Sequence, residues 1–294
     1  MKKIFLSIIA TLFFTAANAD VKGQALSKVS KEISEYTIGL IPGEGTTELD
    51  IQLSDKDDND PTVNLLILRD IYKQERSNFF TQISLHDQDF GFKDKRYIGN
   101  FGLGYRALNE DNSYMQGINI FYDQDLSENH SRVGIGFEAK AGILDVNLNY
   151  YEPTTLQKTI DGKKEQVLGG HDYTLASQMP YMPWAKVNYT GYKHTADLAS
   201  EDTKGEKYIA EMNLTSSLVL ETELDKSGNG GDDFSSVRIT FVHPPRNSTT
   251  SLSDGFLSNQ AFYKKDMTTT LSEKVKRNNN LVIESQGAVI ITKQ

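Results

Sequence analysis

Apolar and polar residues alternate along most of this chain, and this two-residue period restricts the fold more than any other sequence feature. Successive side chains of a β-strand point to opposite faces, so the alternation predicts strands with one apolar and one polar face. Ile118, Ile120 and Tyr122 illustrate it in the stretch 117–140, which reads as a hairpin. Such faces suit a soluble β-sandwich with its apolar face inward, or a membrane barrel with its apolar face outward.

The connections between the alternating segments separate these two folds. About twelve segments follow one another between residues 46 and 242. The first two connections have about eight residues each, and from the third connection onward long and short connections alternate. The long ones are polar, as in DQDLSENHS (123–131) and the stretch 152–170, whereas Ala141-Gly142 is a compact turn. Outer-membrane barrels have an even number of strands, long loops on one side and short turns on the other. We therefore expect an all-β fold, a transmembrane up-and-down antiparallel barrel of about 12 strands. A soluble sandwich is the weaker alternative.

The N-terminus indicates export from the cytoplasm. Residues 1–19 contain two lysines, an apolar run and the small-residue site Ala17-Asn18-Ala19. This pattern is typical of a secretory signal peptide, and the mature chain would then begin at Asp20. The apolar run, Ile4–Phe14, is too short for a membrane anchor. We therefore expect secretion across the inner membrane and a location in the bacterial outer membrane.

The composition of the chain argues against several kinds of partner and site. Without Lys2 and Lys3 it carries 29 basic and 40 acidic residues, a net charge of −11. Nucleic-acid binding depends on neutralising phosphates, so nucleic acid is not an expected partner. The chain has no cysteine, which excludes disulfides and thiolate metal sites. We expect no cofactor.

A barrel with its apolar face toward lipid places the polar face in the lumen. Tyrosines near strand ends would then form an aromatic belt at the membrane surfaces, namely Tyr97, Tyr105, Tyr122, Tyr150, Tyr151, Tyr181 and Tyr208. Glu48 and Asp50 would face the lumen, as would ten further charged residues. These ten are Arg132, Glu138, Lys140, Asp145, Lys186, Lys207, Glu211, Glu221, Glu223 and Arg238. Charges of both signs can pair across strands, or hold open a hydrated channel and grip a chain inside it.

Signals for catalysis or metal binding are weak. His171-Asp172 could form an acid–base dyad, but a polar pair at a loop edge is the simpler interpretation. The sequence has neither a G-x-S-x-G nor an H-E-x-x-H motif. DDND (57–60) and GNGGDD (228–233) contain carboxylates that Ca²⁺ favours, yet neither has EF-hand spacing. We expect no enzyme activity and no metal site, and an outer-membrane hydrolase remains a weaker alternative.

Two motifs carry a family resemblance. The stretch FYDQDLSENHSRVGIGFE (121–138) resembles the hairpin signature of the intimin/invasin family, the inverse autotransporters. The matching residues are Phe121, Asp123, Gln124, Asp125, Asn129, Arg132, Gly134, Gly136 and Glu138. A second match lies far downstream, where Arg277, Asn278, Asn279 and Asn280 precede an apolar strand. The resemblance extends from about residue 46 to residue 284.

The resemblance implies a type V secretion translocator in the outer membrane. It divides the chain into a signal peptide (1–19), a periplasmic segment (20–45), a barrel (46–242), a linker that plugs the pore (243–276) and an exported remnant (277–294). Family members export a passenger of immunoglobulin-like domains that adheres to cells, and residues 243–294 are too few for one such domain.

We therefore expect a conduit that threads and displays its own short C-terminal segment and contributes to adhesion or surface contact. The expected partners are outer-membrane lipid, the barrel-assembly machinery and periplasmic chaperones, with a host-surface or separately encoded protein as a further candidate. A small plugged porin-like barrel is the alternative.

Overall fold

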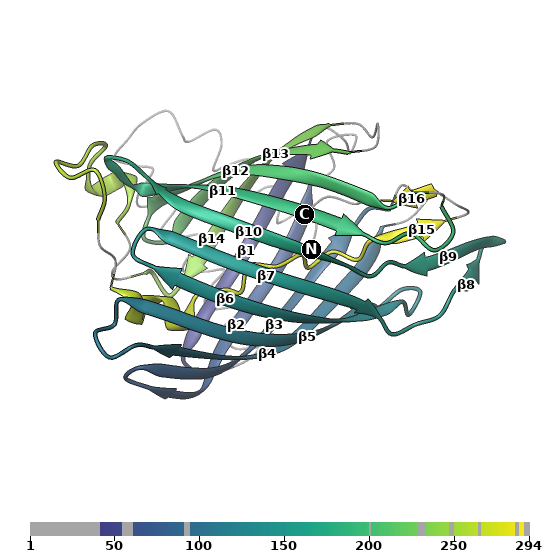
Figure 1. The fold of residues 1–294 in the computed structure, drawn as a ribbon, viewed down its shortest axis with the longest axis horizontal. Helices are drawn as coiled ribbons and strands as arrows, with labels where there is room; N and C mark the ends of the chain where they lie inside the picture. Colours follow the sequence, from purple (N-terminus) through teal and green to yellow (C-terminus); the bar gives the residue numbers. More distant parts are fainter. Residues whose placement is uncertain are drawn as a thin grey trace.

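A closed barrel of twelve antiparallel strands forms the body of the protein (Figure 1). The structure is a computed structural model that describes residues 42–54, 61–90, 95–199, 201–228, 233–246, 250–263, 266–285 and 288–290. Around the barrel the strand order is β1-β14-β13-β12-β11-β10-β7-β6-β5-β4-β3-β2. The predicted 12-stranded up-and-down barrel is thus confirmed. The predicted signal peptide and nearly all of segment 20–45 lie outside the described residues.

The elements follow one another along the chain with these bounds. The barrel strands are β1 (Gly45–Ser54), β2 (Thr62–Gln74), β3 (Ser77–Gln88), β4 (Arg96–Leu108), β5 (Tyr114–Asp125), β6 (Ser131–Ala141), β7 (Leu144–Pro153), β10 (Gly170–Met179), β11 (Met182–His194), β12 (Thr203–Thr215), β13 (Leu218–Ser227) and β14 (Phe234–His243). The other elements are β8 (Lys158–Ile160), β9 (Lys163–Val167), η2 (Leu252–Asp254), η3 (Met267–Ser272), β15 (Ile283–Ser285) and β16 (Ala288–Ile290). Within the described residues, no helix has the length and apolar character needed to cross a bilayer.

Short turns gather at one end of the barrel and long loops at the other, which we call the short-turn end and the long-loop end. Three connections differ from the sequence expectation. The stretch DQDLSENHS (123–131), expected to be a loop, is reduced to residues 126–130, because β5 continues to Asp125 and β6 begins at Ser131. The second connection is a turn of only Glu75 and Arg76, because β2 continues through polar residues to Gln74. Arg69 lies in this continuation and donates to the carbonyl oxygens of Thr46 and Leu68. The stretch 152–170, expected to be a loop, contains the hairpin β8–β9.

The barrel wall is apolar outside and polar inside. Ile118 and Ile135 are 61% and 59% exposed on the outer face, whereas Asn119 and Glu138 are 5% and 1% exposed on the inner face. Exposure of such an apolar outer face to water would cost free energy, so this face is suited to contact with lipid. Six of the seven tyrosines expected in the aromatic belt are exposed. Tyr151 is the exception, and its assignment to the belt is wrong because its side chain is fully buried inside the barrel.

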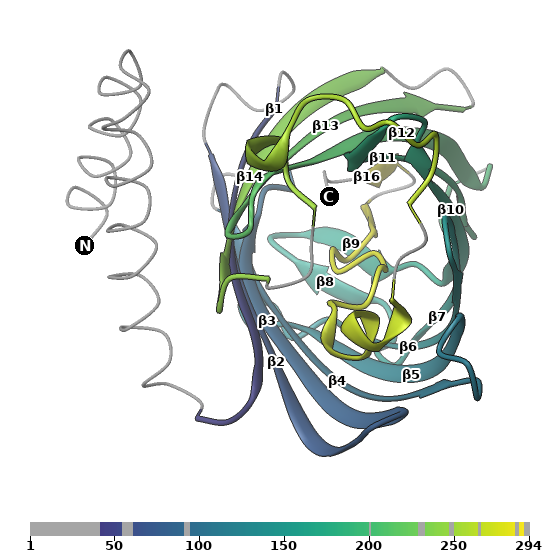
Figure 2. The same cartoon turned by 90° about the vertical axis from the view of Figure 1, so that its left-hand side faces the viewer.

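After β14 the chain returns to the barrel and runs through its interior (Figure 2). It first crosses the rim at the short-turn end, where Trp184 donates its indole N–H to the carbonyl oxygen of Phe256 at 2.9 Å. Helix η3 then contacts β2, β3, β4 and β5. The following residues reach the long-loop end, where β15 pairs with β9. We call residues 267–285 the interior segment.

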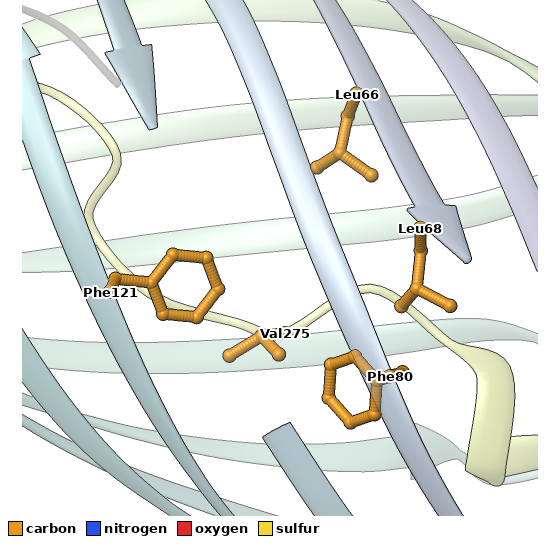
Figure 3. Packing of buried hydrophobic residues seen from close by; sticks show 5 residues of the cluster. All are labelled: Leu66, Leu68, Phe80, Phe121 and Val275. Atoms are coloured by element: carbon orange, nitrogen blue, oxygen red, sulfur yellow. The ribbon is translucent and has the colours of Figure 1, made fainter. Parts of the chain in front are cut away.

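A small apolar cluster seats the interior segment against one side of the wall. Val275 packs with Leu66, Leu68, Phe80 and Phe121 (Figure 3). The two phenylalanine rings occupy space that two glycines leave open: Phe80 pairs with Gly104 across β3 and β4, and Phe121 pairs with Gly102 across β4 and β5. A Cβ atom on either glycine would collide with the facing ring. The glycine-rich stretch FGLGYR (101–106) of β4 thus makes room for the two phenylalanine rings that contact Val275.

Candidate functional site: the seat of the interior segment

Asp123 on β5 joins the wall to the interior segment through two buried guanidinium groups. Arg277 of the segment donates to both carboxylate oxygens of Asp123, at 2.9 and 2.6 Å. Arg132 on β6 donates its Nε–H to the same carboxylate at 2.8 Å. Asp123 and Arg132 are fully buried, and the Arg277 guanidinium stacks 4.3 Å from the centre of the Phe121 ring. Charge-assisted and bidentate bonds of this kind are the strongest hydrogen bonds in proteins, so this pair is the main polar anchor of the segment.

The backbone of Asn278 is held on both sides by wall side chains. Its N–H donates to the Tyr151 hydroxyl at 2.8 Å, and its carbonyl oxygen accepts from Arg132 at 2.7 Å. Tyr151 in turn donates to Asp172 at 2.6 Å. The next carbonyl, of Asn279, accepts from Asn100 at 2.9 Å. This network fixes the segment along the barrel axis as well as against the wall.

Side-chain amides of the wall bind the backbone elsewhere along the segment. Gln82 accepts from the Val275 N–H at 2.8 Å. Gln88 accepts from the Leu281 N–H at 3.1 Å and donates to the Leu281 carbonyl oxygen at 2.7 Å. Because these contacts reach only main-chain atoms, they do not depend on the side chains of the segment. They replace the backbone pairing that an extended chain would otherwise find in a sheet.

Lysines of the segment pair with wall carboxylates toward the short-turn end. Lys274 lies 2.9 Å from Glu48, and Lys276 lies 2.9 Å from Glu211. In the opposite sense, Lys140 of the wall lies 2.9 Å from Glu273 of the segment. The wall and the segment therefore complement each other in charge.

All twelve predicted lumen charges lie on the inner face of the wall. Glu48, Lys140 and Glu211 pair with the interior segment. Arg132 serves both, because it pairs with Asp123 of the wall and donates to the Asn278 carbonyl oxygen of the segment. The others bond within the wall: Asp50 with Asn64, Glu138 with Arg106, Asp145 with Lys186, Lys207 with Glu223 and Asp225, and Glu221 with Arg238.

The residues of the two motifs fall into different surroundings. Gly134 lies against Tyr151 and Arg277, and Gly136 lies between Asn119 and Asn149. Asp125 accepts from the N–H groups of Ser127 and Glu128 in the turn, whereas Gln124 accepts from the Tyr122 hydroxyl on the outer side. Arg277, Asn278 and Asn280, expected in the exported remnant, lie inside the barrel: the Arg277 side chain is 1% exposed, and Asn278 and Asn280 are each 7% exposed.

Several wall residues that contact the interior segment were not predicted from the sequence. Tyr151 is assigned to the aromatic belt, and Phe121 is part of the first motif without an assigned role, although each side chain breaks the rule that the inner face is polar. Arg106 pairs with Glu138 and donates to carbonyl oxygens of the segment, and it is the last residue of the glycine-rich stretch FGLGYR (101–106). Gln82 alternates with apolar residues along β3, which marks it only as inward-facing, whereas Gln88 lies among polar residues that read as a loop. Their binding role depends on a chain about 190 residues away and leaves no local signal.

The dyad proposed for a hydrolase does not form. His171 is exposed on the outer face of β10, whereas Asp172 is buried on the inner face and bonds to Asn149 and Tyr151. Adjacent residues of a strand point to opposite faces, so the two cannot cooperate. Within the described part of the chain, no group of three or more His, Asp or Glu side chains could hold a metal ion. The DDND loop and most of GNGGDD lie outside it.

A polar cavity of about 160 Å³ remains beside the interior segment. Its wall side includes Asp50, His86, Thr190 and Arg238, and its other side is formed by Lys274–Asn280. The segment therefore packs mainly against β2–β7 and does not fill the lumen completely on the side of β10–β14 and β1.

His130 at the long-loop end offers a pH test. Burial and the nearby Lys158 cation lower the pKa of its imidazole from 6.5 to about 4. Between these values the unfolded chain binds more protons than the folded one. The contribution of neutral His130 to the free energy of unfolding is therefore fully present above pH 6.5 and is lost as pH drops toward 4, by about 3 kcal/mol. We expect His130→Gln to flatten this loss, measured by hydrogen exchange of residues 125–131. The same change at the exposed His171 should leave the dependence intact.

The chain is similar to known proteins of one family. The sequence profile of the inverse autotransporter β-domain matches residues 10–279. An attaching and effacing protein homolog of Escherichia coli (strain K12) is 30% identical over 166 residues, covering 55% of this chain and 52% of that protein. The inverse autotransporter adhesin YeeJ of the same strain is 28% identical over 224 residues, covering 72% of this chain and 9% of that protein. This chain thus spans about half or less of these relatives.

A solved structure shares the fold. It comes from work on the mechanism of in-meso crystallization of membrane proteins, and it superposes with a TM-score of 0.62 at 18% identity. The match covers 82% of this chain and 99% of that one.

Proposed function

Since this chain belongs to the inverse autotransporter family, we propose that it threads its own C-terminal segment through the barrel and displays it at the cell surface. The protein is a β-barrel of the bacterial outer membrane and not an enzyme. In this proposal the short-turn end faces the periplasm and the long-loop end faces the exterior. The conduit acts by positioning and needs no chemical step.

One observation carries this proposal: wall side chains hold an extended chain at successive levels between the two ends of the barrel. The contacts run from Lys274–Glu48 through Arg277–Asp123 to Leu281–Gln88. Many of them reach main-chain atoms, which suits a conduit that must accommodate differing side chains as the chain passes. Charge pairs then hold the final position.

Surface display can be measured directly on cells. An epitope added after Gln294 should be accessible to antibody on intact cells. The same epitope inserted at Gly142, in a turn at the short-turn end, should become accessible only after the outer membrane is permeabilised. Detection of the C-terminal epitope only after permeabilisation would contradict the proposal.

Adhesion and biogenesis are further parts of the proposal. The long polar loops and the displayed segment supply the surface that a host or separately encoded protein would contact. Insertion of the barrel would use the assembly machinery and periplasmic chaperones that serve outer-membrane barrels generally. The polar cavity beside the segment favours one competing function, a partly plugged porin-like barrel.

A further inference from the structure

The interior segment joins a second sheet as it leaves the barrel. Its strand β15 pairs antiparallel with β9, and the order β16-β15-β9-β8 makes a four-stranded sheet separate from the barrel, seen at the right of Figure 1. Ile283 pairs with Val167, and Glu284 pairs with Gln166. The Leu168 N–H donates to the carbonyl oxygen of Val282 at 2.9 Å. The hairpin β8–β9 thus binds the emerging chain by strand addition.

The side chains of the emerging strand enter two different environments. Leu281 and Ile283 are fully buried with Phe90, Ile98 and Val167. Glu284, one residue later, is also fully buried. Its carboxylate accepts from the consecutive N–H groups of Asp197 and Leu198, at 2.9 and 2.7 Å, and of Ala199. Successive backbone N–H groups that converge in this way form an anion-binding nest.

Both loops are fixed to the barrel and to each other. Glu165 of β9 accepts two hydrogen bonds from Arg96 of β4, at 3.1 and 2.9 Å. Gln166 donates to Asp197 at 2.7 Å and so links the hairpin to the β11–β12 loop. The surfaces that receive the strand are therefore held in place by the barrel.

We propose that the β8–β9 hairpin and the loop residues Asp197–Ala199 form a strand-docking site that fixes the register of the exported chain. The site takes an extended segment with apolar residues on one face and a carboxylate on the other. A shift by one residue would turn every side chain to the opposite face and bring the Glu284 carboxylate into the apolar cluster. Docking thus opposes backward slippage and leaves the far edge of β15 for a following strand, as the pairing of β16 shows. This inference rests on the proposed function, and it assigns a role to the residues at the long-loop end, where the threaded chain leaves the barrel.

Hydrogen exchange of the full-length protein tests this docking site. Glu284→Gln keeps the size of the side chain but removes the charge that the nest binds. We expect the exchange protection of residues 197–199 and 166–168 to fall about tenfold or more, since hydrogen bonds to ionised groups are among the strongest. The control is Glu152→Gln, because Glu152 is an exposed glutamate near the same end that accepts from the Tyr150 hydroxyl. The control should leave exchange at these residues unchanged.

The pattern of lost protection decides the outcome. Loss confined to the two loops and β15, with protection kept at Val275 and Asn278, supports a distinct docking site. Equal behaviour of the two variants would overturn it, as would a loss spread evenly over the whole interior segment. Failure of the C-terminal epitope to reach the surface would instead contradict the proposed function, so the two failures are distinguishable.

Discussion

Replacing Asp123 with alanine is expected to destabilise the protein by about 3–5 kcal/mol, because two buried guanidinium groups lose the carboxylate they share. Asp123 is the common partner of Arg132 on the wall and Arg277 on the interior segment. Removal of one partner from a buried ion pair leaves uncompensated charge in a site that water reaches poorly. The urea dependence of unfolding from lipid vesicles measures the loss.

Gln124→Ala is the matched control for this substitution. Gln124 is the next residue of β5 and its side chain accepts from the exposed Tyr122. Gln124 is half-buried and makes no charged contact within the described residues, so we expect a change below about 0.5 kcal/mol there, as for most substitutions outside the core. Similar losses in the two variants would show that Asp123 does not anchor the interior segment. Arg277→Ala should cost less than Asp123→Ala, because Asp123 would keep Arg132.

Truncation before the interior segment is expected to convert a closed barrel into an open channel. Eight strands enclose only side chains and sixteen or more enclose a channel, so a barrel of twelve has room for water once the segment is gone. The inner wall is charged and would stay hydrated. A chain that ends at residue 250 should therefore conduct ions in planar bilayers, whereas the full-length chain should conduct weakly, through the small cavity beside the segment.

A chain that ends at residue 287 provides the control for the truncation. It keeps the interior segment, including the contacts of Arg277 and Leu281, so it should behave as the full-length protein does. Equal and large conductance in all three chains would refute the closed state and favour the porin-like alternative. Heat-modifiable migration on gels would show that each chain has folded into a barrel.

The wall residues that bind the interior segment could be predicted only in part. The two motifs marked Asp123, Arg132 and Arg277, yet nothing local in the sequence says that they meet, since Arg277 lies 154 residues from Asp123. The inward position of Phe121 followed from alternation with Ile120 and Tyr122. Its role did not, because an aromatic ring inside a polar lumen makes sense only with Val275 packed against it.

At the long-loop end even less of the structure could be predicted from the sequence. Residues 152–170 read as a polar loop because hydrophobic periodicity is weak in β8 and β9. The hairpin gains a stable partner only when β15 arrives from a position more than 110 residues later. Glu284 likewise reads as one polar residue in an apolar strand, and its binding to the amides of Asp197 and Leu198 depends on loop geometry.

The sequence by itself determined the faces of the barrel, because a period of two admits only one division of each strand into an outer and an inner side. The alternation of long and short connections also determined which face meets lipid. Tertiary structure alone decided which inward charges pair with each other and which hold the interior segment. The physical reason is that barrel closure brings side chains from distant strands within hydrogen-bond reach, and such short-range contacts leave no periodic trace in the chain.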